Sequence, residues 1–324
     1  MKIAMIGQKE VPSRVGGIEV AVEALAVRMA ARGHDVTLYN CCRRGLRAAE
    51  RKVKYKNFKG VHICEISVPD IRGVSAAWGS IMATIRAVPE KYDCIHYHAE
   101  GSAVLSFLPH LIGIRTVVTI HGLDWQRRKW GSFAAGYLKL GERIAVGSAD
   151  RIIVLSRAMQ EYFCKTYHRE TVIIPNGMDH PVLREAGKIR KKWGLQRDGY
   201  ILFVGRIVPE KGLEMLISAF LKTATEKKLV IAGGISDTRN FYRMLQRMAQ
   251  ADTRILFTDF VQKEELEELY SNCYFYCLPS EIEGMPISLL EAMSYGSACL
   301  CSDIPECMEV IEGNGVLFKK RDEE

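Results

Sequence analysis

The sequence predicts an α/β protein built of two Rossmann-like domains, each with a doubly wound parallel sheet. Its 324 residues exceed one ordinary core, because domains average roughly 150 residues. Short apolar runs alternate along the chain with stretches long enough for a crossover helix. The alternation breaks at Pro175-Asn176-Gly177 and resumes at Tyr200. We therefore expect domains at residues 1–176 and 177–324, facing one another across a cleft that binds the ligand.

The first half supplies the strands of one sheet. Apolar runs predict strands at residues 3–6, 36–39, 61–66, 94–97, 116–120, 151–155 and 172–174. Between the first two runs, helical spacing predicts a helix that ends at Gly33 and turns one face inward: Ile18, Val22, Leu25 and Met29.

The second half repeats this plan. Strands are predicted at residues 200–204, 229–232, 255–257, 274–278, 298–301 and 316–318. A helix over 212–223 directs Leu213, Leu216, Ile217 and Phe220 inward, and an acidic helix covers 263–270.

Composition excludes several classes of protein. Hydrophobic residues make up 48% of the chain and charged residues 26%, which is typical of a soluble globular enzyme and excludes wholesale disorder. The longest uncharged apolar run, residues 101–114, falls short of the roughly 18 residues that a bilayer span needs. The amino terminus lacks an export signal, so we expect a cytoplasmic protein. Its ten scattered cysteines are then thiols, mostly in buried strands, and form neither disulfides nor a metal site.

Positive charge is concentrated in the first half. Residues 1–176 carry 26 Lys or Arg against 15 Asp or Glu, whereas residues 177–324 carry 19 against 23. Much of the excess lies within residues 43–59, and a second cluster is Arg127-Arg128-Lys129. Two interpretations stay open: a solvated face, or a surface that docks on anionic lipid headgroups or an acidic acceptor. Nucleic acid is disfavoured, because no binding motif accompanies the charge.

Two classes of nucleotide-binding protein lack support in the sequence, and the first loop, residues 7–17, bears on one of them. It lacks G-x-G-x-x-G, and the second strand ends at Asn40 without an acid to hold a ribose, which disfavours a dehydrogenase. No G-x-x-x-x-G-K-[ST] occurs, which excludes a P-loop NTPase. Gly16 and Gly17 instead open a helix whose free N–H groups suit an oxyanion. The alternative is a glycine pair needed only for close packing.

The strongest signal is a pair of segments that follow two buried strands, residues 205–212 and 279–293. In the first, Arg206 and Lys211 can neutralise a diphosphate leaving group without a metal ion. The alternative is a surface ion pair with Glu210. In the second, Glu283 falls on the loop and Glu291 lies more than one turn inside the following helix, so that the two carboxylates reach different parts of a ligand.

His121 marks the other half. It follows the strand 116–120 and precedes Gly122, a position at the carboxyl edge of the sheet that favours a functional role over a structural one. Glu19 and Asp124 either bind acceptor hydroxyls or cap helices.

These segments resemble the retaining family 4 glycosyltransferases of the two-Rossmann B fold, and the resemblance covers nearly the whole chain. Residues 11–19 and 119–125 look like the rhamnosyltransferase-type amino-terminal domain of bacterial polysaccharide enzymes. The resemblance implies transfer of a sugar, with retention, from a nucleotide-diphosphate sugar to a glycan or polyprenyl-linked acceptor. It also implies that no residue acts as a covalent nucleophile. Because Arg206 and Lys211 can balance the leaving group, we expect no metal and no further cofactor, and the basic first half suggests a cytoplasmic enzyme peripheral on the inner face of the plasma membrane.

The resemblance also assigns roles to individual residues. It places His121 near the reacting carbon of the donor sugar, Glu283 on the transferred sugar's hydroxyls and Glu291 on the ribose. It gives the remaining donor contacts to the backbone-rich positions of the two segments: Gly205, Gly284, Met285, Pro286, Ile287 and Ser288.

Two departures and two alternatives accompany the resemblance. Val15 stands where many relatives carry tyrosine, and relatives continue past residue 318 with a long helix that returns to the first domain. We expect a fragment or a shortened form with lower stability and exposed apolar surface. The alternatives are a nucleotide-sugar epimerase of the same fold and a donor-binding subunit without turnover.

Overall fold

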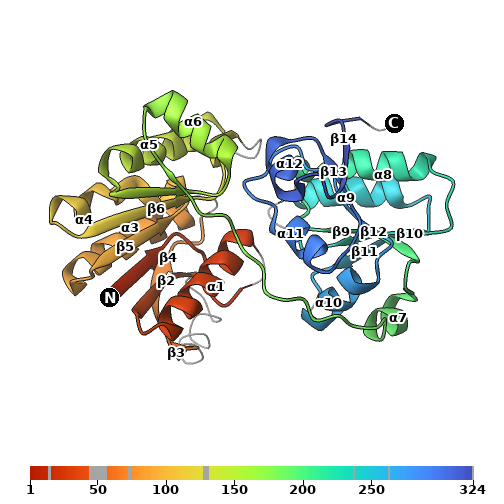
Figure 1. Ribbon diagram of the computed structural model, residues 1–324, viewed down its shortest axis with the longest axis horizontal. Helices are drawn as coiled ribbons and strands as arrows, with labels where there is room; N and C mark the ends of the chain where they lie inside the picture. The colour runs from red at the N-terminus through yellow and green to blue at the C-terminus, as the bar shows by residue number, and fades with distance from the viewer. Residues whose placement is uncertain are drawn as a thin grey trace. The chain divides into compact units, whose positions relative to one another are not determined.

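The computed structural model describes residues 1–13, 16–43, 57–71, 74–126, 131–235, 238–261 and 263–322 (Figure 1). The chain divides into two compact units, Met1–Pro175 and Asn176–Glu324. The predicted boundary lies one residue further along. Both units are α/β, with parallel sheets and Rossmann-like connections.

The amino-terminal unit contains a sheet with the strand order β3-β4-β2-β1-β5-β6-β7-β8. Its strands are β1 (Lys2–Ile6), β2 (Asp35–Arg43), β3 (Asn57–Phe58), β4 (Val61–Val68), β5 (Cys94–His98), β6 (Arg115–Ile120), β7 (Arg151–Val154) and β8 (Val172–Ile173). All described pairs are parallel except β3 with β4. The prediction missed β3, a two-residue strand that turns back through Lys59 and Gly60, both at positive φ.

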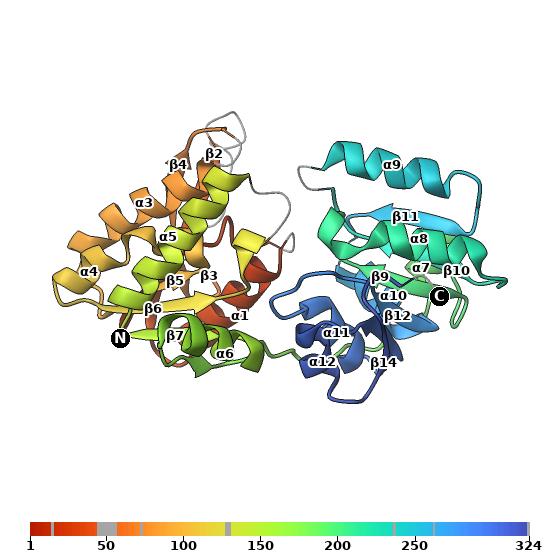
Figure 2. The same ribbon diagram turned by 90° about the horizontal axis from the view of Figure 1, so that it is seen from above.

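Helices cover both faces of this sheet (Figure 2). They are α1 (Gly17–Ala31), α3 (Ser75–Ala87), α4 (Phe107–Leu111), α5 (Ser132–Ser148) and α6 (Arg157–Tyr167). Helix α1 packs Val22 and Ala26 against the face that carries β1 and β2, and α3 and α5 pack alanines against the opposite face. The prediction that Leu25 faces inward is wrong: it is 38% exposed, because the contact stripe runs through Val22 and Ala26.

The carboxyl-terminal unit contains an all-parallel sheet with the order β11-β10-β9-β12-β13-β14. Its strands are β9 (Tyr200–Val204), β10 (Lys228–Ala232), β11 (Ile255–Asp259), β12 (Phe275–Leu278), β13 (Cys299–Ser302) and β14 (Val316–Phe318). Its helices are α7 (Lys188–Trp193), α8 (Leu213–Lys222), α9 (Arg239–Ala249), α10 (Lys263–Asn272), α11 (Ile287–Ser294) and α12 (Pro305–Ile311).

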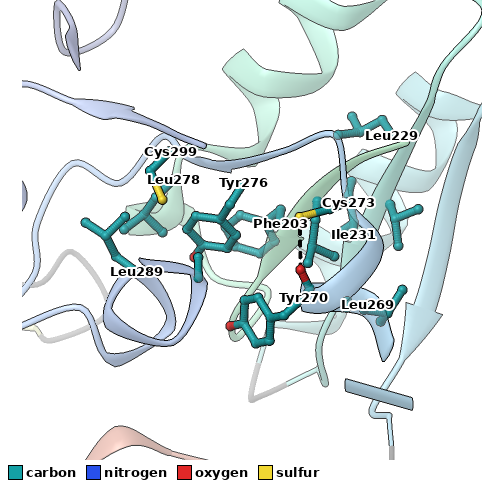
Figure 3. Packing of buried hydrophobic residues seen from close by; sticks show 14 of the residues in the cluster. Phe203, Leu229, Ile231, Leu269, Tyr270, Cys273, Tyr276, Leu278, Leu289 and Cys299 are labelled. Carbon is teal, nitrogen blue, oxygen red and sulfur yellow. Dashed lines mark hydrogen bonds between the residues drawn. The ribbon is translucent and has the colours of Figure 1, made fainter. Parts of the chain in front are cut away.

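One hydrophobic core joins these elements, and Figure 3 shows Phe203, Tyr276, Leu278 and Leu289 packed within it. The face predicted for α8 is confirmed, since Leu213, Ile217 and Phe220 are buried and Leu216 packs against them. The cysteines of β12 and β13 are buried free thiols as predicted, whereas the equally buried Cys273 follows α10 and lies outside a strand.

Each sheet has one point where the strand order reverses direction. In the first unit this point lies between β1 and β5, and in the second between β9 and β12. Ligands of open parallel sheets bind beyond the carboxyl ends of the strands at such points. The residues that follow β5 and β6 in one unit, and β9 and β12 in the other, are therefore the places to look for chemistry.

None of the described helices combines the length and the apolar character needed to cross a membrane. The basic residues 44–56 and 127–129, which motivated the docking hypothesis, lie outside the described residues.

Candidate active site

Two loops build the candidate site of the carboxyl-terminal unit. The first follows β9 and contains the short helix η4 (Pro209–Lys211), and the second leads from β12 into α11. The backbones of the two loops touch: the amide of Glu281 donates to the carbonyl of Glu210 at 2.9 Å. Gly212, at φ +66°, has no room for a side chain, since a Cβ there would lie 2.1 Å from the carbonyl oxygen of Pro279. The contact fixes Lys211 beside the second loop.

Lys211 and Glu283 form an ion pair through Nζ and Oε1. Their side chains are only 13% and 10% exposed, so water screens the pair weakly. The alternative considered from the sequence was a surface ion pair with Glu210. In the structure Glu210 is 4% exposed, and neither of its carboxylate oxygens has a hydrogen-bond partner among the described residues. The cation therefore faces the carboxylate assigned to sugar binding.

Arg206 lies half-buried, directly after Gly205, and forms no ion pair with any residue that the structure describes. Its guanidinium keeps its five N–H donors for a ligand. An uncommitted arginine and a buried lysine on one loop at the reversal point of a parallel sheet suit the oxygens of a diphosphate.

Glu291 lies inside α11, and its carboxylate is bonded by a tyrosine that the sequence analysis did not predict. The hydroxyl of Tyr270, on α10, donates to Glu291 Oε2 at 3.0 Å. Burial and this carboxylate raise the pKa of Tyr270 well above its ordinary value, so the phenol keeps its proton. A second core tyrosine, Tyr276 on β12, bonds Ser288 Oγ at 2.8 Å. Both rings lie in the core, where Figure 3 shows them side by side.

The start of α11 presents backbone donors. Pro286 precedes the helix, and its carbonyl accepts from the amides of Leu289 and Leu290. The amides of Ile287 and Ser288 come before these first intrahelical bonds, and free amides at a helix start are suited to an anion. Gly284 is buried, and the sulfur of Met285 accepts from the amide of Asn176 at 3.1 Å.

In the amino-terminal unit, the predicted anion site at Gly16 and Gly17 holds a carboxylate of the chain itself. Glu19, in the first turn of α1, accepts from the amide of Lys9 at 3.2 Å, and a Cβ at Gly16 would lie 2.3 Å from Glu19 Oε2. The amide that bonds Glu19 belongs to the first loop, and the described residues show no side-chain hydrogen bond at the cap of α1, so neither role considered for Glu19 is decided. A bound anion would have to displace this carboxylate.

Asn40 corrects another expectation. Strand β2 continues to Arg43, and the Asn40 side chain is buried within it. It accepts from the amide of Val11 at 3.2 Å and donates to the carbonyl of Val11 at 2.7 Å. Asn40 therefore holds the first loop in place, where the sequence had suggested only a missing ribose ligand.

His121 lies at the carboxyl end of β6 and joins two further histidines. Its Nε2 is 3.1 Å from Nδ1 of His98, the last residue of β5. The ring of His98 packs against that of His96, with centroids 4.2 Å apart. Burial lowers the pKa of His121 to about 4 and that of His96 to about 3, so both are neutral at pH 7. The pattern of two histidines two residues apart at a strand end could have signalled this cluster.

Asp124 opens the short helix η3 (Asp124–Gln126), which two buried glutamates support. Its amide donates to Glu100 Oε1 at 3.1 Å, and the indole of Trp125 donates to Glu142 Oε2 at 3.2 Å. Burial and the neighbouring Asp124 raise the pKa of Glu100 well above its ordinary value. The sequence did not predict either glutamate.

The described residues contain no group of three or more His, Cys, Asp or Glu side chains that could hold a metal ion. In the carboxyl-terminal unit the structure pairs Lys211 with Glu283. In the same unit, Tyr270 bonds Glu291 and Tyr276 bonds Ser288. In the other unit the structure brings Gly16 to Glu19, and it places His121 and Asp124 on one stretch of chain.

Comparison with known families agrees with this division. The family model described as Glycosyltransferase Family 4 matches residues 15–181. The model described as Glycosyl transferases group 1 matches residues 185–324.

Individual relatives of this chain are also glycosyltransferases. An uncharacterized glycosyltransferase of Bacillus subtilis is 29% identical over 64% of this chain, which spans 57% of that protein. One of Methanocaldococcus jannaschii is 28% identical over 98% of this chain and 84% of its own length. The UDP-Gal:alpha-D-GlcNAc-diphosphoundecaprenol alpha-1,3-galactosyltransferase of Escherichia coli is 28% identical over 72% of this chain and 64% of its own.

Two solved structures share the fold. Sucrose-phosphate synthase from Thermosynechococcus elongatus has a TM-score of 0.81 at 21% identity, over 99% of this chain and 86% of its own. The Anabaena protein HepE in complex with UDP and glucose has a TM-score of 0.78 at 19% identity, over 100% and 87%. With family models on both units and this fold, the chain belongs to glycosyltransferase family 4.

Proposed function

We propose that this glycosyltransferase moves a sugar, with retention, from a nucleotide-diphosphate sugar to a glycan or polyprenyl-linked acceptor of bacterial cell-surface polysaccharide synthesis. The observation that carries the proposal is the buried Lys211–Glu283 pair beside the uncommitted Arg206, at the strand-order reversal of the second sheet. The same position holds cations for the diphosphate and a carboxylate for the sugar.

In the proposed reaction, the bond between the anomeric carbon and the diphosphate oxygen breaks and the acceptor oxygen bonds that carbon on the same face. The acceptor's hydroxyl proton passes to the departing diphosphate. Arg206 and Lys211 stabilise the negative charge that collects on the leaving oxygen, and this role requires no metal ion. Glu283 accepts hydrogen bonds from the transferred sugar's hydroxyls while its charge stays balanced by Lys211.

The nucleotide binds at α11 in this proposal. Glu291, oriented by Tyr270, accepts the two ribose hydroxyls, and the amides of Ile287 and Ser288 face phosphate oxygens. Gly205, Gly284, Met285 and Pro286 supply the remaining contacts with the donor. In the other unit, His121 contacts the transferred sugar, and Asp124 serves the acceptor.

The acceptor class rests on the relatives. The Escherichia coli relative is named for a UDP-galactose donor and a diphosphoundecaprenol-linked acceptor. A lipid-linked acceptor requires an enzyme that works at the cytoplasmic membrane surface, and the positive charge of residues 1–176 supports such docking.

The test uses a panel of UDP-, GDP-, ADP- and dTDP-sugars. We expect one donor to bind with chelator present and, with acceptor, to give a product whose anomeric configuration by NMR equals that of the donor. Arg206→Ala and Lys211→Ala should each lower kcat/KM by at least about a hundredfold. The matched control Arg197→Ala, an exposed arginine of the same unit, should leave it unchanged.

Three results would overturn the proposal. The first is a folded protein that binds none of the donors. The second is transfer that disappears with chelator and returns with manganese. The third is a donor epimerised at one sugar carbon without any acceptor, which would identify the epimerase alternative. Donor binding without transfer to any acceptor would instead identify the binding subunit.

A further inference from the structure

His98 is a buried imidazole that the proposed reaction does not use. It ends β5 at the point where the order of the first sheet reverses. Its backbone is clamped: Ser102 Oγ donates to the His98 carbonyl at 2.7 Å, and a Cβ at Gly7 would lie 2.1 Å from that oxygen. The next amide, of Ala99, donates to the carbonyl of Thr119 at 2.8 Å. The His98 side chain therefore has a fixed origin.

Its two ring nitrogens have different surroundings. Nδ1 lies 3.1 Å from His121 Nε2, within hydrogen-bond distance. Nε2 is buried and has no hydrogen-bond partner among the residues that the structure describes. The ring cannot turn away easily, because it packs against His96, which is itself held by a 2.7 Å hydrogen bond between its Nε2 and Thr119 Oγ1.

Proton placement follows from this asymmetry. Burial lowers the pKa of His98 well below its ordinary value and that of His121 to about 4, so both rings are neutral and each carries one proton. If His121 donated the shared bond, His98 would carry its proton on Nε2 and bury an N–H without an acceptor. If His98 donates from Nδ1, its buried Nε2 is only a lone pair. Burying an unpaired donor is the rarer and more costly case in proteins.

We propose that His98 is a positioning residue that donates from Nδ1 to His121 Nε2 and so fixes His121 as the Nδ1–H tautomer. His121 then presents a neutral N–H donor to its ligand, which must offer an acceptor atom such as a sugar hydroxyl or ring oxygen. In this state neither nitrogen of His121 can take up a proton, because one carries a hydrogen and the other accepts a bond. His121 is therefore a hydrogen-bond donor and not the base that deprotonates the acceptor.

The ligand part of this inference rests on the proposed function, whereas the tautomer does not. The tautomer is measured directly by long-range proton–nitrogen NMR correlation of protein labelled in its histidines. The His121→Asn variant assigns the His121 signals by their loss. We expect a protonated Nδ1 and an unprotonated Nε2 on His121 in the free protein, near neutral pH. A protonated Nε2 on His121 would overturn the proposal without bearing on the transferase.

Substitutions of His98 separate the hydrogen bond from mere packing. Asn carries an amide nitrogen where His98 carries Nδ1, so His98→Asn should keep His121 in the Nδ1–H form. His98→Phe keeps the ring's volume and its stacking on His96 but removes the donor, and it should shift His121 towards the Nε2–H form. The same tautomer in both variants, each shown to be folded by circular dichroism, would refute the positioning role.

Activity provides a second readout once a donor is known. His98→Phe should lower kcat for transfer by about tenfold to a hundredfold with a smaller change in donor KM, as is typical when the partner that orients a functional histidine is removed. His98→Asn should recover most of this loss. Equal losses in the two variants would mean that His98 acts only through packing.

Discussion

Lys211 and Glu283 carry opposite charges on side chains that are about nine-tenths removed from water. A pair in this situation gains little in net stability, but losing one member leaves an uncompensated charge. Lys211 is thus already ordered in the free protein, so in the proposed reaction it contacts the diphosphate without the cost of ordering a mobile side chain, while it still balances the charge of Glu283.

A double-mutant cycle tests this pair. Lys211→Met should lower the free energy of unfolding by about 3 kcal/mol because Glu283 is left unpaired. Lys211→Met combined with Glu283→Gln should cost at least about 1 kcal/mol less than the two single changes added together. Urea unfolding measures all four proteins. The exposed pair of Lys165 and Glu161 is the control, and the same cycle there should show no measurable coupling. Strict additivity at Lys211 and Glu283 would contradict the buried pair.

At the scale of elements, close backbone contacts place the two loops of the carboxyl-terminal unit. Gly212 approaches the carbonyl of Pro279, and Gly233 approaches that of Gly205. A side chain at either position would have to push a loop away from its neighbour. The two loops therefore keep their positions because glycines allow close backbone contacts, in addition to the ion pair.

Two glycines with nearly the same backbone angle make this testable. Gly212 has φ +66° and no space for a Cβ, whereas Gly194 has φ +64°, with only the Lys228 Nζ within 4 Å, at 3.9 Å. Gly194→Ala should cost about 1 kcal/mol of unfolding free energy, for the backbone angle alone. Gly212→Ala should cost about 2 kcal/mol more, from the clash.

Donor binding separates the two glycine variants further. Gly212→Ala should weaken donor affinity in calorimetry, because it displaces Lys211, and Gly194→Ala should not. Equal effects of the two variants on both stability and affinity would show that the loop contact does not position the site.

At the scale of the molecule, the buried histidines make the stability of the amino-terminal unit depend on pH. The unfolded chain binds protons at these imidazoles as the pH falls through about 6.5, whereas the folded protein resists until about pH 4 at His121 and about pH 3 at His96. Stability is therefore fully present above pH 6.5 and is lost as the pH falls towards these values. Glu100 acts in the opposite sense, because its raised pKa lets the folded state hold a proton that the unfolded chain releases.

The contribution of one histidine is isolated by substitution. The wild type should lose unfolding free energy when the pH is lowered from 7 to 5, because His96 resists protonation only in the folded state. In His96→Phe this loss should be smaller by about 2 kcal/mol, since 1.4 kcal/mol corresponds to one pKa unit. His180→Gln, at an exposed histidine, should leave the loss unchanged. Urea unfolding at the two pH values measures the difference. An identical pH dependence in His96→Phe would mean that His96 does not resist protonation.

Local patterns of the chain determined much of this protein. Runs of apolar residues placed the principal strands to within a few positions, and the residues after their carboxyl ends marked Arg206, Lys211, Glu283, Glu291 and His121 for chemistry. The strand predictions succeed because strand formation, helix starts and the direction of a parallel strand depend on neighbours in sequence, whereas the chemical roles of these residues stay predictions. Strand β3 and the direction of Leu25 were missed, because short hairpins and the exact stripe of a helix depend on what packs against them.

Only the tertiary structure decided which of these residues meet. Lys211 lies 72 positions before Glu283, yet the two pair, and Glu210 next to it stays apart. Tyr270 bonds Glu291, His98 lies within hydrogen-bond distance of His121, and the Glu19 carboxylate lies beside Gly16 and bonds the Lys9 amide. The physical reason is that partners on different strands are chosen by sheet order and by the space left at each crossing. Neither quantity is written in the local pattern of a single chain segment.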